Sequence, residues 1–77
     1  MKVNILMFGQ LQEKAGTSNM ELENVGNLDE VKNIMTSKFP FLGQMKYLVA
    51  LNQEVVRGNA ELKDQDEIAI MPPFAGG

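Results

Sequence analysis

The chain closes on the stretch Ile68-Ala69-Ile70-Met71-Pro72-Pro73-Phe74-Ala75-Gly76-Gly77, which joins a strand pattern to a short extension. Its two isoleucines alternate with alanine and methionine, which is typical of a strand that packs one face on a core. The two prolines that follow fix φ at successive positions and donate no backbone hydrogen bond, so they end the strand and favour a stiff, extended geometry. We therefore expect a folded domain over residues 1–71 and an extended tail over residues 72–77.

The tail has the composition of a segment that threads into another protein. After Phe74 no side chain is larger than a methyl group, and the backbone of Gly76 and Gly77 fits channels that exclude other residues. Six extended residues could carry the terminal carboxylate, the one reactive group of the tail, roughly 20 Å from the domain. The alternative is an inert end, because Gly-rich chain ends are commonly disordered.

Length and composition predict one small globular domain without side-chain sulfur or metal chemistry. The chain has 77 residues, with 44% hydrophobic and 22% charged side chains, which is ordinary for a globule and leaves no room for a second domain. It contains no Cys and no His. This absence removes the common zinc and iron ligands, disulfides, and thiol or imidazole catalysts.

Charge and hydropathy limit the expected partners and location. The net charge is −3, and the seven Lys and Arg residues are scattered rather than gathered in a stripe, so nucleic acid and membranes are not expected partners. A basic protein surface suits this charge better. The chain has no apolar run of membrane-spanning length and its N-terminus lacks the apolar core of a signal peptide, so we expect a cytoplasmic protein.

The first strand is predicted over residues 2–9. Its alternation puts Val3, Ile5 and Met7 on the core face, whereas Leu6 and Phe8 end the opposite, outward face. Apolar side chains on a face that would otherwise be wet indicate a partner. The alternative is that Phe8 packs under the loop that follows it.

A polar connection and a second strand follow. Residues 10–17 place Leu11 and Ala15 at helical spacing, which allows one helical turn closed by Gly16. Met20 and Leu22 then alternate with polar residues, so residues 19–23 are expected to pair with the first strand as a hairpin.

The main helix is predicted over residues 28–38. Asn27 and Glu30 fit a capping box with Asn as the cap, and Pro40 disfavours helical geometry at the residue before it. The apolar stripe that would pack on the sheet comprises Leu28, Val31, Ile34, Met35 and Phe39.

The remaining segments complete an α+β domain. Residues 41–45 predict a short irregular or helical turn, and residues 47–51 form the most apolar strand, which we expect to be central. Asn52 and Gln53 predict a turn into a brief strand over residues 54–56, and Leu62 reaches the core before the last strand. The predicted order is strand, strand, helix, strand, strand, strand.

Several of these segments together resemble the small subunit of molybdopterin synthase. They are the first strand into Phe8-Gly9-Gln10, the run Val49-Ala50-Leu51-Asn52-Gln53, residues 62–70, and the closing stretch Met71 to Gly77. The resemblance covers the length of the chain and implies a ubiquitin-like β-grasp fold, with a mixed sheet of four to five strands on one main helix. One departure concerns the last turn, where the family often has Gly between two acids and this chain has Gln65.

The resemblance also implies a specific chemistry. A partner enzyme would use ATP to adenylate Gly77, and the acyl-adenylate would be converted to a thiocarboxylate. The tail would then enter the large synthase subunit, in a heterotetrameric complex, and donate sulfur to a cyclic pyranopterin monophosphate. By this match Gly77 is the sulfur carrier and Gly76 the residue that lets it pass. No cofactor would be bound permanently.

The chain by itself is expected to catalyse nothing, because its Asp, Glu and Lys residues form no recognisable acid–base or metal-ligand pattern. Three alternatives stay open at this point. A sulfur carrier for thiazole synthesis shares the fold and the Gly-Gly end, although Pro-Pro before the tail favours the molybdopterin branch. A ubiquitin-like modifier would join Gly77 to lysine, and a plain interaction module would have an inert tail.

We also predict a docking face for the large subunit at the root of the tail. If the first, last and hairpin strands lie side by side, Phe8, Val55 and Met71 form an apolar patch there. Pro72, Pro73, Phe74 and Ala75 would continue the contact along the tail.

Overall fold

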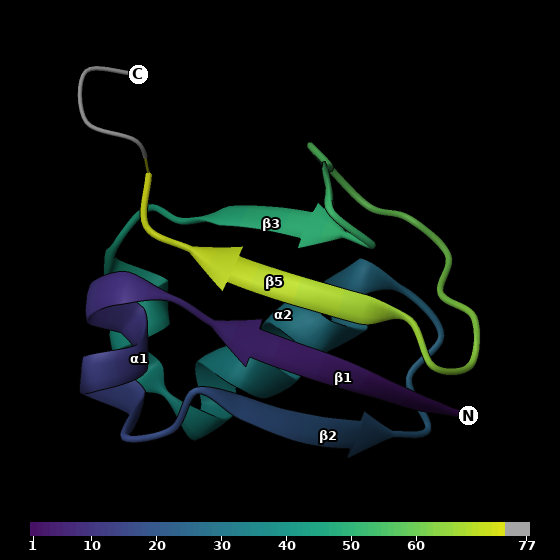
Figure 1. Cartoon of the computed structure of the whole chain (residues 1–77), viewed down its shortest axis with the longest axis horizontal. Helices are drawn as coiled ribbons and strands as arrows, with labels where there is room; N and C mark the ends of the chain where they lie inside the picture. The colour runs from purple at the N-terminus through teal and green to yellow at the C-terminus, as the bar shows by residue number, and fades with distance from the viewer. Residues whose placement is uncertain (74–77) are drawn as a thin grey trace.

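The computed structural model describes residues 1–73 as one sheet layer covered by helices (Figure 1). Phe74, Ala75, Gly76 and Gly77, to which the sequence assigns the tail's function, lie outside the described residues. The elements in chain order are β1 (Lys2–Met7), α1 (Gly9–Ala15), β2 (Asn19–Glu23), α2 (Leu28–Lys38), the 3-10 helix η1 (Pro40–Gln44), β3 (Leu48–Leu51), β4 (Glu54–Val55) and β5 (Glu67–Met71).

The five strands form one mixed sheet in the order β2-β1-β5-β3-β4. The strands β1 and β5 are parallel, and the other three pairs are antiparallel. The C-terminal ends of β1 and β5 therefore lie at the same end of the sheet. The prediction that β3 would be central is confirmed in that β3 is an interior strand, between β5 and the two-residue β4, although β5 occupies the middle of the sheet.

The helix α2 crosses behind the sheet and buries the core between the two layers (Figure 1). The predicted inward residues of β1 and β5 are confirmed, since Val3, Ile5, Met7, Ile68 and Ile70 are at most 1% exposed. From α2 and the flanking segments the core receives Leu28, Val31, Met35, Leu42, Val49 and Leu62. No helix within residues 1–73 is long and apolar enough to cross a membrane.

The connection between β1 and β2 holds more structure than its sequence indicated. Instead of one turn, α1 has seven residues, buries Leu11 completely, and ends at Gly16 in the left-handed region with φ 76°. The hairpin pairing of β1 with β2 is confirmed. Burial of one leucine thus converts a segment that looks polar into a helix over the edge of the core.

The bounds predicted for the main helix are confirmed, but its cap differs in one hydrogen bond. The side chain of Asn27 accepts from the backbone N–H of Glu30 at 2.9 Å, as a capping box requires. The Glu30 carboxylate accepts from the N–H of Gly26 at 2.6 Å, one residue before the cap. Glu30 therefore anchors the entering chain rather than closing the box on Asn27.

The turn into β5 holds Gln65, at the position where the family often has Gly, in an unusual backbone conformation. Gln65 has φ 68°, in the left-handed region where a side chain is strained and glycine is not. Its backbone N–H donates to the Lys2 carbonyl at 2.6 Å, so the start of β1 fixes this conformation.

We expect Gln65→Gly to raise the free energy of unfolding by about 0.5 kcal/mol, because relief of left-handed strain exceeds the entropy that glycine gains in the unfolded chain. Urea denaturation measures the change. The control Gln12→Gly, inside α1, should instead lower the free energy of unfolding by about 1 kcal/mol. Equal losses at both sites would contradict the assignment of strain to Gln65.

The neighbouring Asp64 is expected to make the free energy of unfolding depend on pH in the acid range. The backbone N–H of Lys2 donates to its carboxylate at 2.8 Å, and this hydrogen bond lowers the pKa of Asp64 below its usual 3.8. Because the folded pKa is depressed, the stabilisation is present above the unfolded pKa and is lost as pH falls through the folded pKa. We expect Asp64→Asn to remove this part of the acid sensitivity. The titration of the Asp64 carboxyl group can be followed by NMR, and a midpoint at or above 3.8 would contradict the lowered pKa.

Candidate functional site

The sheet face opposite α2 carries two apolar rows that cross the strands. One row runs Phe8, Met71, Leu48, since Leu48 pairs with Met71 and the register of β1 with β5 continues from Met7↔Ile70 to Phe8. The parallel row runs Leu6, Ala69, Ala50, Val55 through successive pairings of β1, β5, β3 and β4. We call these seven residues the outer apolar face.

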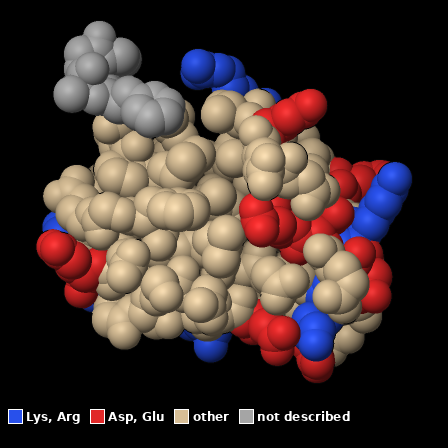
Figure 2. All heavy atoms as spheres, in the orientation of Figure 1, with Lys and Arg blue, Asp and Glu red and all other residues tan. Residues whose placement is uncertain are grey.

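Two side chains of the outer apolar face are exposed to solvent, and Leu6, Leu48 and Met71 are partly exposed. Phe8 is 45% exposed and Val55 49%, whereas Ala50 and Ala69 lie almost covered between their neighbours. Figure 2 shows the middle of this side as a continuous surface without charged residues, with an acidic side chain at its left margin and most of the charges in this view gathered near the opposite end of the sheet. An uncharged apolar surface on so small a domain is typical of a partner site.

The structure places Phe8, Val55 and Met71 on one face, as the sequence predicted, but it does not make them one cluster. Phe8 and Met71 are row neighbours, whereas Val55 lies three strands from Phe8, about 15 Å away at ordinary strand spacing. Leu6, Leu48, Ala50 and Ala69 connect them. The alternation of each strand puts these residues outward, yet only the cross-strand register shows that they join the three predicted positions.

The tail leaves the sheet beside Phe8. The backbone N–H of Phe8 donates to the Ile70 carbonyl at 3.2 Å, which holds the ends of β1 and β5 together. Gly9 has φ 58°, and a Cβ built on it would lie 3.1 Å from Cγ of Pro72, so the two backbones approach closely there. Pro72 is partly buried by this contact, and Pro73 is exposed. The root of the tail is therefore directly next to the Phe8, Met71, Leu48 row.

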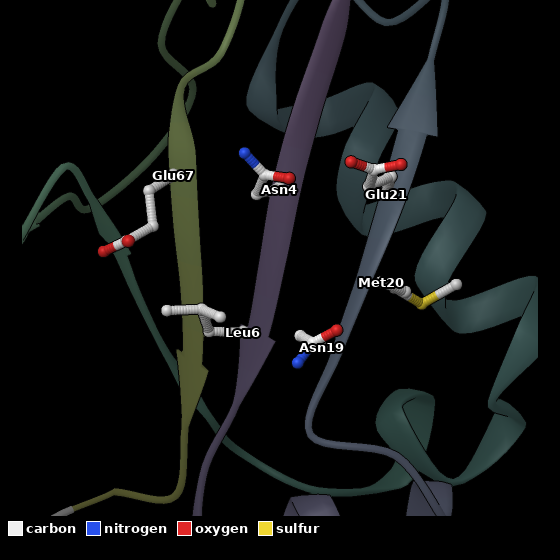
Figure 3. Close-up of a pocket in the computed structure, with 6 residues that line it drawn as sticks. All are labelled: Asn4, Leu6, Asn19, Met20, Glu21 and Glu67. Atoms are coloured by element: carbon white, nitrogen blue, oxygen red, sulfur yellow. The ribbon is translucent and has the colours of Figure 1, made fainter.

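A shallow polar hollow of about 500 Å³ adjoins the apolar rows over β2, β1 and β5. Figure 3 shows Asn4 between Glu67 and Glu21, with Leu6 and Asn19 at the lower end. Asn4 pairs with both glutamates, so the two carboxylates stand two strands apart, with Cα atoms about 10 Å from each other. Lys2 contacts one of them, with Nζ 3.4 Å from the Glu21 carboxylate.

The strand register places the Asn4 amide between the two glutamates of this hollow, so they are not adjacent partners in the sheet. Among residues 1–73 no group of three or more acidic side chains is placed to hold a metal ion. The described part of the chain offers a surface for binding, and the reactive group that the sequence suggests is the carboxylate at Gly77.

The architecture defines the class of the protein. A five-stranded mixed sheet on one main helix, with parallel first and last strands and a chain end that leaves from the last strand, is the ubiquitin-like β-grasp fold. A putative molybdopterin converting factor subunit 1 from Pyrococcus furiosus superposes with a TM-score of 0.87 at 20% identity, over 96% of this chain and 99% of that one. The predicted fold class is thus confirmed.

The chain belongs to the ThiS family, whose model matches residues 5–77. It is 37% identical over 83 residues to the molybdopterin synthase sulfur carrier subunit of Chlamydomonas reinhardtii, covering all of both chains. It is also 33% identical over 82 residues to the subunit of the same name from Mycobacterium tuberculosis, covering all of this chain and 99% of the other.

Two solved structures combine this fold with higher identity. The small archaeal modifier protein 1 of Methanosarcina acetivorans has a TM-score of 0.83 at 27% identity, over 99% of this chain and 96% of that one. A chain from the complex of subunits 1 and 2 of the molybdopterin-converting factor from Helicobacter pylori has a TM-score of 0.75 at 26% identity, over all of this chain and all of that one.

Proposed function

We propose that this chain is the sulfur-carrier subunit of a molybdopterin synthase. The observation that supports this most is its 37% identity, from end to end, with a sulfur carrier subunit of that enzyme, in a family match that extends to Gly77. The outer apolar face at the root of the tail supplies the surface that a carrier needs for its partners.

The proposed chemistry takes place at the carboxylate of Gly77. A carboxylate is a poor acyl donor because its oxygen leaves poorly, so the carboxylate first attacks ATP on the activating enzyme and pyrophosphate departs. A sulfur nucleophile then displaces AMP from the acyl-adenylate, which leaves a thiocarboxylate. The carrier contributes the acid and its delivery, whereas the activating enzyme and the large subunit contribute the catalytic groups. Because activation consumes ATP, we expect it to occur in the cytoplasm.

The large subunit is the proposed occupant of the outer apolar face. The relative from Helicobacter pylori was solved as a complex of subunits 1 and 2, which supports a partner of this kind here. Pro72 lies against Gly9 next to that face, so we expect a partner seated on it to receive Phe74, Ala75, Gly76 and Gly77 as well. The pterin substrate would meet the carrier only inside the large subunit.

Reconstitution with an activating enzyme, a sulfur donor, the large subunit and the pyranopterin tests this function. Intact mass alone is ambiguous, since exchange of oxygen for sulfur and oxidation of one of the six methionines each add about 16 Da. The mass increase must therefore be located in a C-terminal peptide that contains Gly77 and lacks Met71. Absence of ATP-dependent loading at Gly77, or loading without molybdopterin formation, would contradict the proposal.

A ubiquitin-like modifier is the second candidate, favoured by the 27% identity with a small archaeal modifier protein. Both functions begin with adenylation and differ in the acceptor. An isopeptide bond between Gly77 and a lysine, found by peptide mass mapping after incubation with cell extract and ATP, would favour the modifier. Sulfur transfer to a thiazole precursor instead of the pyranopterin would favour a carrier for thiazole synthesis.

A further inference from the structure

The methionines of this chain differ sharply in their surroundings. Met7 and Met35 are at most 1% exposed in the core, where a dissolved oxidant does not reach them. Met71 is partly exposed at the end of β5, in the middle of the row that Phe8 and Leu48 complete. Met20 is also partly exposed, but its pairing with the buried Ile5 puts it on the α2 side of the sheet. Met20 borders the polar hollow at β2, although Figure 3 shows its side chain directed away from Asn4 and Leu6.

We propose that Met71 is an oxidative modification site, and that its oxidation by hydrogen peroxide in the free carrier weakens docking on the large subunit. This inference rests on the proposed function of the outer apolar face. The thioether sulfur attacks one oxygen of hydrogen peroxide and the O–O bond breaks, and the proton of the attacked oxygen passes to the departing hydroxide, which leaves as water. Sulfur is oxidised by two electrons to the sulfoxide and the peroxide is reduced, so no other reactant is needed.

The position of Met71 determines the consequence. A thioether is apolar and adapts to a partner surface, whereas a sulfoxide is polar and strongly hydrated. Phe8 and Leu48 flank Met71 on the adjacent strands, and the neighbouring row offers Ala69 and Ala50, so these four side chains provide no hydrogen-bond donor for the new oxygen. Docking would then bury an unsatisfied polar group, which we expect to weaken binding about tenfold. Fold stability should change little, because Met71 lies outside the core cluster.

The test uses the full chain without a thiocarboxylate, since that group would itself react with peroxide. The carrier is treated with hydrogen peroxide, oxidation at each methionine is quantified by peptide mass mapping, and affinity for the large subunit is measured by calorimetric titration. Met71→Leu removes the proposed site while keeping an apolar side chain. Met20→Leu is the matched control, because it removes a partly exposed methionine from the opposite face.

We expect peroxide to weaken binding about tenfold for the wild type and for Met20→Leu, and to leave Met71→Leu unchanged. Methionine sulfoxide reductases should restore the affinity. The bound large subunit should also slow oxidation of Met71 but not of Met20. Tight binding by the oxidised wild type, or equal loss in Met71→Leu, would overturn the inference and leave the proposed function intact. If the untreated carrier does not bind at all, the proposed docking face is wrong and the inference fails with it.

Discussion

One residue added after Gly77, or the substitution Gly76→Val, is expected to reduce sulfur transfer at least about 100-fold. Extension removes the carboxylate from the position where it is activated. Under the proposed function the backbone at Gly76 passes through a narrow channel of the partner, where valine would add bulk and restrict φ. The measurement is molybdopterin formation with purified partners, accompanied by mass analysis of thiocarboxylate at the chain end.

Both variants should fold normally, because the core is built within residues 3–70. The matched control is the same residue added before Met1, since Figure 1 places the N-terminus at the opposite end of β1 from the root of the tail. This control should keep full activity. If an extended or Gly76→Val carrier supports wild-type molybdopterin synthesis, the reactive-tail hypothesis is wrong.

Phe8→Ala or Met71→Asp is expected to weaken association with the large subunit tenfold or more. Ordering four or five tail residues costs about 1 to 2 kcal/mol each in backbone entropy, and so opposes binding by several kcal/mol. Phe8, Met71 and Val55 are already half covered or more in the free carrier, so burying what remains exposed contributes at most about half of the 1.5 to 3 kcal/mol of a full burial apiece, which offsets part of that cost. Removing one large contact, or placing a carboxylate in the apolar row, therefore weakens binding.

Calorimetric titration gives the affinities, and circular dichroism with thermal melts checks the fold. The melting temperature should change little, because Phe8 is 45% exposed and Met71 lies outside the core cluster. Asn33→Asp is the control for added charge, since Asn33 is exposed on α2 in the other layer of the molecule. Unchanged affinity for both test variants would move the docking surface elsewhere and leave Phe8 with a packing role at the loop.

The sequence alone determined most of the elements, because their signals are local. Alternation specified which residues of β1 and β5 face the core, and Asn27 with Pro40 marked both ends of α2. The tail is likewise a property of the sequence, since prolines and glycines act through their own backbone geometry. The helix α1 was underestimated because one buried leucine stabilises it, and burial of a single side chain leaves little periodic signal.

Only the tertiary structure decided how these parts meet. The central position of β5, the contact of Gly9 with Pro72, and the two rows of the outer apolar face all depend on cross-strand register. Register is set by pairings between segments as distant as β1 and β5, and no local pattern encodes which outward residues become neighbours. The sequence therefore specified a carrier-like tail and a sheet with an apolar outer side, whereas the fold brought Phe8, Met71 and Leu48 together at the root of that tail.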